Sequence, residues 1–305
     1  MPRYVTRGRK TRQARYRKRA PTRKYRRPTR PSYRRRKSGG MSKRQVLNTT
    51  SRKKRNGMLS WSNTNNTAAS QSVGLGDAYV NSGGGFFVWC ATGQTLDTNS
   101  VIPNQASRTA TTCYMRGLSE HLRIQTSSGI PWLHRRICFT LKGINAFNTL
   151  SAGDTPIQKY VPIADTTNGI ERLWFNEQIN AMSVTLGDQW GILFKGANGR
   201  DWNNLILAPV DTSRVSLKFD KTYTISSGNT NGVFRERKLW HPMNKNLVYD
   251  DDESADAVNP SNYSVDSKAG MGDYYIVDII QPGTGATTND YCVVSANSTL
   301  YWHEK

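Results

Sequence analysis

Few residues in this chain belong to the types that hold metals or carry redox chemistry. Among 305 residues there are four cysteines and four histidines, and no two cysteines form a C-x-x-C pair. Zinc sites draw on closely spaced Cys and His ligands, so the sequence predicts no metal site, and the composition indicates no cofactor. We expect Cys90, Cys113, Cys138 and Cys292 to be small buried hydrophobic residues with reduced thiols.

Enzyme signatures are also missing. The chain has no G-x-x-x-x-G-K-[ST] phosphate loop, no G-x-S-x-G nucleophile elbow and no H-E-x-x-H zinc motif. Its longest apolar stretches, such as 86–91 and 274–277, are far shorter than a membrane span, and no apolar segment follows the N-terminus. We therefore expect a non-enzymatic protein with no secretory signal and no membrane association.

Acidic residues are absent from the first 55 positions, which hold 24 Lys or Arg. The whole chain has 43 basic and 22 acidic residues, so residues 56–305 carry 19 of the basic residues and all of the acidic ones. The net charge of +21 is therefore a property of the N-terminal segment. Such a segment is too polar and self-repelling to fold alone, and its common use is to neutralise a polyanion, with nucleic acid as the first candidate.

The composition of this basic arm, residues 1–55, favours a single strand as its partner. Seventeen of its 24 cations are Arg, whose planar guanidinium binds phosphate through two parallel hydrogen bonds. Four tyrosines lie between the cations, where they could stack on exposed bases, and three prolines interrupt any long helix. We expect an extended or disordered arm that orders on its partner. The residues predicted to contact nucleic acid are Arg3, Arg7, Arg9, Lys10, Arg12, Arg15, Arg17, Lys18, Arg19, Arg23, Lys24, Arg26, Arg27 and Arg30.

Two runs of four basic residues in the arm fit the short pattern of nuclear import signals. They are Arg34-Arg35-Arg36-Lys37 and Arg52-Lys53-Lys54-Arg55, and we expect both to bind host nuclear import receptors. An arm this basic contains such runs by chance, so the pattern is compatible with a nuclear route without establishing one. Two other interpretations of the arm are a solubilising tail and a mitochondrial transit peptide, although the amphipathic period of a transit peptide is missing.

The rest of the chain has the pattern of an all-β protein. Residues 38–85 are rich in Gly, Ser, Asn and Thr, and we expect residues 56–112 to be a linker with a possible first strand. Beyond them, short runs rich in aromatic and β-branched residues are bounded by Gly, Pro, Asn and Asp, which is typical of strands joined by turns. Eight strands are predicted, at 113–126, 133–141, 190–195, 215–225, 233–241, 247–250, 273–281 and 291–303. They suggest one sandwich or jelly-roll domain over residues 113–305.

A long connection, at about 143–189, interrupts this domain. Asn168 followed by Glu171 resembles a capping box and predicts a short helix through Leu173, Trp174 and Met182, while residues 181–186 are also compatible with a strand.

The one cluster of carboxylates is Asp250-Asp251-Asp252-Glu253. Consecutive side chains spread around a loop and do not converge on one reacting bond, so they indicate no catalytic site. We expect a solvated loop, a contact with basic side chains of a neighbouring subunit, or a cation site.

Three segments resemble the capsid proteins of genomoviruses (gemycircularviruses) and, more distantly, the coat proteins of geminiviruses. They are Trp190 to Gly196 (W-G-I-L-F-K-G), Asp201 to Asn204 (D-W-N-N) and Lys238 to Glu253 (K-L-W-H-P-M-N-K-N-L-V-Y-D-D-D-E). The resemblance covers most of residues 190–303, the arm matches only in composition, and nothing familiar is found in residues 56–112.

This resemblance implies a single eight-stranded jelly roll that assembles as about 60 copies into the smallest icosahedral (T=1) shell, with its arms inward. It also implies a virion protein that packages circular single-stranded DNA and enters the host nucleus. About 60 arms of 24 cations supply roughly 1,400 positive charges, which suits a single strand of one to a few thousand nucleotides. The alternative is a cellular chromatin or ribonucleoprotein component with a basic tail on a β-domain.

Overall fold

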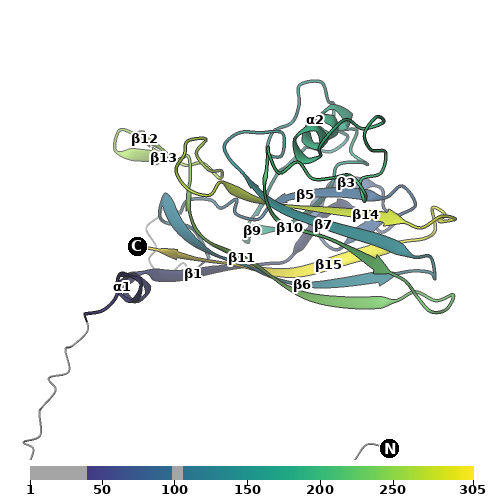
Figure 1. Cartoon of the computed structure of the whole chain (residues 1–305), viewed down its shortest axis with the longest axis horizontal. Coiled ribbons are helices and arrows are strands. Elements are labelled where there is room, and N and C mark those ends of the chain that lie inside the picture. The colour runs from purple at the N-terminus through teal and green to yellow at the C-terminus, as the bar shows by residue number, and fades with distance from the viewer. Residues whose placement is uncertain (1–39, 98–105) are drawn as a thin grey trace, which may run out of the picture.

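The computed structural model describes residues 40–97 and 106–305, which form two layered β-sheets with a helical cap (Figure 1). Five strands make the first sheet: β1 (Arg52–Met58), β4 (Ala78–Val80), β6 (Thr112–Thr126), β11 (Phe234–Val248) and β15 (Cys292–Glu304). Eight make the second: β2 (Ser60–Thr64), β3 (Ser70–Leu75), β5 (Gly85–Cys90), β7 (Trp132–Leu141), β8 (Ala164–Thr166), β9 (Gly169–Asn176), β10 (Ser216–Ile225) and β14 (Asp273–Pro282). The remaining elements are α1 (Lys43–Thr50), α2 (Ser183–Leu193) and the hairpin of β12 (Asp252–Ser254) with β13 (Ala257–Asn259).

The strand order in both sheets crosses repeatedly between early and late parts of the chain. The five-stranded sheet runs β1-β15-β6-β11, with β4 also paired to β15, and the larger sheet runs β10-β7-β14-β5-β9-β2-β3, with β8 paired to β9. All of these pairs are antiparallel except β2 with β9. The two sheets pack face to face.

The five-stranded sheet has one face in the core and one in solvent. Buried and exposed residues alternate along β1, β6 and β15, as the period of two in a strand requires. Apolar residues of these strands pack against the second sheet in two clusters, one around Trp89 and Trp302 and the other around Leu122 and Trp174.

The middle of the eight-stranded sheet is covered on both faces, whereas its edge strands β10 and β3 are largely exposed. Every residue of β5 is buried, as are the first eight residues of β14, and this is why these strands show no polar alternation. On the face away from the first sheet, Phe86, Phe139 and Tyr275 pack against α2 and the loops around it, through Leu186 and Leu193. In Figure 1, α2 lies above this sheet.

A balanced set of buried charges links the two sheets. The Arg136 guanidinium binds both oxygens of Asp278, at 2.7 and 2.9 Å, and also contacts Glu120. Arg172 lies 3.7 Å from the ring centroid of Trp174 and contacts the same two carboxylates. Burial alone would raise the pKa of both acids, but the two arginines hold the pKa of Glu120 below its ordinary value, and Arg136 with His134 holds that of Asp278 well below it.

Five of the predicted strands are confirmed. They are 113–126, 133–141, 215–225, 273–281 and 291–303, which correspond to β6, β7, β10, β14 and β15. The predictions at 233–241 and 247–250 were wrong as separate strands, because β11 runs unbroken through Pro242. This proline is tolerated because β11 is an edge strand that pairs only with β6.

Two predictions in and just after the long connection were wrong: a predicted helix is a strand, and a predicted strand is mostly helix. Residues 169–176, predicted to be helical, form β9, which pairs with β5 on one side and with β2 on the other. Residues 190–195, predicted to be a strand, lie mostly in α2. The connection between β7 and β10 therefore reaches residue 215, and α2 makes it a cover for the larger sheet.

The expected linker was also wrong. Residues 40–97 contain α1 and five strands, and β1 pairs along its whole length with β15. The folded domain therefore begins well before residue 113, and the basic segment that precedes it ends before α1 rather than at residue 55.

Candidate nucleic-acid interface

All of the predicted nucleic-acid contacts lie outside the described residues. Residues 1–39 hold all of the predicted arm contacts from Arg3 to Arg30, and also the first import run, Arg34 to Lys37. The structure therefore bears on the folded part of the chain, residues 40–97 and 106–305.

The second basic run, Arg52 to Arg55, is part of β1. Lys54 is 4% exposed, and its ammonium group lies 3.0 Å from Glu304 while donating to the Ser107 carbonyl at 2.8 Å. Burial raises the pKa of Glu304, but hydrogen bonds from Thr109, Trp302 and Lys54 hold it below its ordinary value. The other three residues of the run are exposed, so the expectation of four accessible cations was wrong because Lys54 points into the protein.

The solvent face of the five-stranded sheet gathers cations from several strands. Lys53 pairs with His303, and Arg55 pairs with Tyr301, across β1 and β15. Lys238 pairs with His121 across β11 and β6. Among the residues that the structure describes, Lys53, Arg55 and Lys238 form no ion pair with a carboxylate.

A β-bulge presents Arg116 on this face. Tyr301 pairs with Gly117 and Trp302 with Met115, so Arg116 has no opposite residue in β15. A bulge places two successive residues on the same side of a sheet and redirects a side chain. The Arg116 guanidinium donates to the uncharged side chain of Asn244, so its charge is not neutralised by that contact.

Gly117 leaves space for an aromatic side chain beside Arg116. A Cβ at this position would come within 2.7 Å of the Trp240 ring and 2.6 Å of the His241 carbonyl. The Trp240 indole therefore lies close over β6, with its ring centroid 6.0 Å from that of Tyr301, and the side chain is 50% exposed.

These residues enclose a pocket of about 440 Å³ at the start of β1. Its lining residues are Lys53, Lys54, Arg116, Ser119, Trp240, Tyr301, Trp302 and His303. Burial lowers the pKa of His303, and Arg116 and Lys53 lower it further. The pocket combines unpaired positive charge with aromatic surface, which is the combination that binds phosphates and bases.

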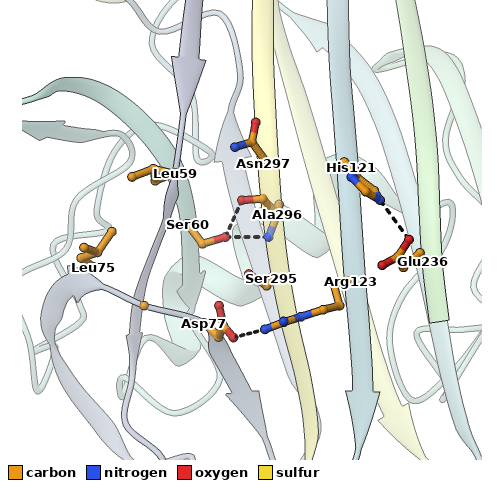
Figure 2. Close-up of a pocket in the computed structure, with 11 residues that line it drawn as sticks. Leu59, Ser60, Leu75, Asp77, His121, Arg123, Glu236, Ser295, Ala296 and Asn297 are labelled. Atoms are coloured by element: carbon orange, nitrogen blue, oxygen red, sulfur yellow. Dashed lines mark hydrogen bonds and ion pairs between the residues drawn. The ribbon is translucent and has the colours of Figure 1, made fainter. Parts of the chain in front are cut away.

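A second hollow of about 460 Å³ on the same face has a different character (Figure 2). There Arg123 lies 3.3 Å from Asp77, and His121 lies 3.4 Å from Glu236. Leu59 and Leu75 form an apolar edge, and Ser60 bonds to both the amide and the carbonyl of Ala296. The arginine and the histidine of this hollow each face a carboxylate within the described part of the chain, whereas Lys53 and Arg116 of the Trp240 pocket do not.

The acidic run divides between two environments. Asp251 accepts two hydrogen bonds from Arg108, which is itself fully buried over the Tyr249 ring at 3.8 Å. Asp250, Asp252 and Glu253 are exposed, the last two on β12 of a hairpin that extends beyond the sheets (Figure 1). The expectation of a solvated loop, a contact with a neighbouring subunit or a cation site was wrong for Asp251, whose charge is offset within the chain by Arg108.

No cluster of three or more His, Cys, Asp or Glu with metal-binding geometry occurs in residues 40–97 and 106–305. All four cysteines are buried and free, as expected from the sequence. Neither helix of the described part is long and apolar enough to cross a membrane.

The Trp240 pocket was missed by the sequence analysis, although a signal for it was present. In β6, β11 and β15, the polar face of each predicted strand carries an aromatic residue two positions from a basic residue or histidine, as in Tyr114 with Arg116, Lys238 with Trp240, and Tyr301 with His303. The bulge at Arg116, which brings these pairs together, also had a signal, because Gly117 lies inside a predicted strand and an isolated glycine there indicates a bulge or a close approach. No protein-family model matches the chain, and no curated protein sequence matches it.

Proposed function

We propose that this chain is the capsid protein of a small virus with a circular single-stranded DNA genome. About 60 copies form a T=1 shell, and the basic N-terminal segment binds the packaged DNA inside it. The protein acts structurally and carries out no chemical reaction.

The observation that carries this proposal is the order of eight strands, four adjacent strands in each sheet. Numbered from one to eight in chain order, these strands are β1, β5, β6, β7, β10, β11, β14 and β15. The five-stranded sheet holds them in the order one, eight, three, six (β1-β15-β6-β11). The eight-stranded sheet holds them in the order five, four, seven, two (β10-β7-β14-β5). This order matches that of a jelly roll, the fold of many viral capsid proteins, and it supports a jelly roll for this chain. The fold alone does not define a function, since lectins and cupins share it.

The charge distribution favours a capsid over those alternatives. Residues 1–37 hold 18 of the 43 basic residues and no acid, while residues 40–305 hold 25 basic and 22 acidic residues. About 60 such segments supply on the order of 1,100 positive charges, still suited to a genome of one to a few thousand nucleotides. The summed positive charge of the basic segments in many copies is therefore of the size needed to neutralise the phosphates of an enclosed genome.

The proposal includes nuclear entry and a contact between subunits. Arg34 to Lys37 is the candidate for binding host import receptors, since β1 holds the second basic run in a sheet. Asp252 and Glu253, on an exposed hairpin, are candidates for contact with basic side chains of a neighbouring copy.

Electron microscopy of the purified full-length protein tests the proposal. We expect closed shells of uniform diameter. A population of monomers or small oligomers, bound to nucleic acid without enclosing it, would favour the cellular chromatin or ribonucleoprotein alternative instead.

A further inference from the structure

The solvent face of the five-stranded sheet carries a pocket that the N-terminal segment does not explain. We propose that the Trp240 pocket binds one nucleotide of the single-stranded DNA, with the base stacked on Trp240 and the phosphates held by Arg116 and Lys53. This inference rests on the proposed function, and it assigns part of the DNA contact to the folded domain.

The aromatic part of the pocket is built to receive a planar group. Trp240 is half exposed on a sheet face where most neighbours are polar, and Gly117 removes the side chain that would displace its ring. Tyr301, at an interplanar angle of 54° to Trp240, forms a second aromatic wall. An exposed indole with a tyrosine beside it offers the stacking surface on which single-stranded bases bind.

The cations of the pocket are available to a phosphate. Neither Lys53 nor Arg116 has a carboxylate partner within ion-pair distance in the described part of the chain. Arg116 is fixed by Asn244, which accepts one of its hydrogen bonds and leaves its other donors free for an anion. Arg55 and Lys238 extend the positive charge along the sheet on either side.

The geometry favours a single strand over a duplex. Bases inside a duplex are already stacked on their neighbours, so only an unpaired base presents a face to Trp240. The hydroxyl groups of Ser119 and Tyr301, which line the pocket, can each donate or accept a hydrogen bond and so distinguish bases poorly. We therefore expect little sequence preference, as a protein that contacts a whole genome requires.

The N-terminal segment enters the fold beside the pocket. Helix α1 ends at Thr50 and Lys53 lies in the pocket, so DNA held by the preceding basic residues is at high local concentration there. Binding of DNA by the N-terminal segment therefore favours binding of the same strand in the Trp240 pocket, and neither site has to change its structure.

Photocrosslinking of the full-length protein to oligo(dT) containing 5-bromodeoxyuridine tests the inference. We expect crosslinked peptides that contain Trp240 or Tyr301, in addition to any from residues 1–39. Crosslinks confined to residues 1–39 would overturn it.

A binding measurement in about 0.5 M salt, where the contribution of the N-terminal segment is weakened, gives a second readout. Trp240→Ala should weaken oligo(dT) binding by roughly 5- to 100-fold, the range of a lost base stack, and leave duplex binding unchanged. Trp240→Phe should recover part of the loss. The control is Arg123→Ala, since Arg123 lies on the same face of β6 but is paired with Asp77.

Two outcomes separate this inference from the proposed function. If Trp240→Ala keeps the oligo(dT) affinity of the parent but no longer forms shells, the face is a subunit contact and the inference is wrong. If the parent protein crosslinks at Trp240 but forms no shells under any condition, the pocket stands and the capsid function fails.

Discussion

At the scale of single residues, the buried charges between the sheets are the most demanding feature of the protein. Arg136 and Arg172 together offset Glu120 and Asp278, and none of the four is more than 1% exposed. His134 completes the arrangement as a neutral ring. Arg237 donates to its Nδ1 at 3.1 Å, so the proton is on Nε2, which donates to Asp278 at 2.7 Å. Burial, as the largest effect, lowers the pKa of His134 accordingly.

We predict that Arg136→Met lowers the free energy of unfolding by about 3–5 kcal/mol, because Glu120 and Asp278 would then share one cation in the interior. Denaturant unfolding of unassembled subunits measures this. Arg123→Met, which removes an exposed ion pair with Asp77, should cost about 0–1 kcal/mol. Equal losses for the two variants would show that the buried charges do not depend on one another.

Two buried groups should give pH dependences of stability that have opposite signs, in pH ranges that overlap between about 4.5 and 6.5. Burial lowers the pKa of His241 to about 4, and Arg136 adds to the effect. The unfolded chain therefore binds more protons between pH 6.5 and 4, and stability falls as the pH falls through this range. Burial raises the pKa of Glu177 to about 8, so the folded state keeps a proton that the unfolded chain loses near pH 4.5, and stability falls as the pH rises between these values.

We predict that Glu177→Gln reduces the loss of stability between pH 5 and 8, because glutamine carries no charge in either state. Unfolding free energies at pH 5, 6.5 and 8 measure the slope. The exposed Glu253→Gln is the control and should keep the slope of the parent. A parent and a Glu177→Gln variant with identical slopes would mean that Glu177 is ionised in the fold without cost.

At the scale of elements, β1 shows how a basic run can be structural. Lys54 ties β1 to the end of β15 through Glu304, while Lys53 on the opposite side of the strand faces solvent. We predict that Lys54→Ala destabilises the domain by about 3–5 kcal/mol and that Lys53→Ala changes stability by less than about 0.5 kcal/mol. Thermal unfolding of both variants, side by side, measures the difference. Similar melting temperatures would contradict the placement of Lys54 in the interior and of Lys53 in solvent.

The same strand changes the expectation for nuclear import. An import receptor binds an extended, accessible peptide, whereas Arg52 to Arg55 are paired with β15. We predict that replacing Arg34 to Lys37 with alanine reduces nuclear accumulation of a fluorescent fusion, and that replacing Arg52, Lys53 and Arg55 has little effect. Two replacements of equal effect would restore the hypothesis of redundant signals.

Five strands were predictable from the sequence, whereas the fully buried β5, the nearly fully buried β9 and the strongly charged β1 were not. β10 and β6 alternate between apolar and polar residues, so their period of two was visible. Seven of the eight residues of β9 are buried, which removes the alternation, and Asn168 with Glu171 imitated a helix start. β1 was not predicted as a strand, because the composition of Arg52 to Arg55 is that of an unfolded basic arm. The capping box at the start of α1, formed by Ser42 and Gln45, was present in the sequence as S-x-x-Q.

The Trp240 pocket was only partly predictable. Arg116, Trp240 and Tyr301 could be placed on strand faces from the sequence, whereas Lys53 lies on β1, which was not predicted. Gly117 indicated a bulge, but a local pattern does not encode which side chain lies over it, and here that side chain is Trp240.

At the scale of the whole molecule, the excess positive charge and the folded domain lie in different parts of the chain. The part of the chain from residue 40 onward is close to neutral and contains all of the described strands and both helices, so its core does not depend on the N-terminal cations. We predict that deletion of residues 1–39 leaves a folded protein with the unfolding midpoint of the parent, but with much less copurifying nucleic acid. A circular dichroism melt and the ratio of absorbance at 260 and 280 nm measure the two properties. An unchanged nucleic-acid content would assign the packaging charge to the folded domain instead.

The mass of the purified full-length particle, measured before and after nuclease treatment, tests the central claim most directly. About 60 chains of 34.3 kDa give a shell of about 2 MDa, and a packaged genome adds mass that nuclease cannot remove until the shell is opened. The account predicts one narrow population at that mass, whose nucleic acid becomes sensitive to a single-strand nuclease only after disruption. Particles far below 2 MDa, or nucleic acid digested while the particles are intact, would contradict it.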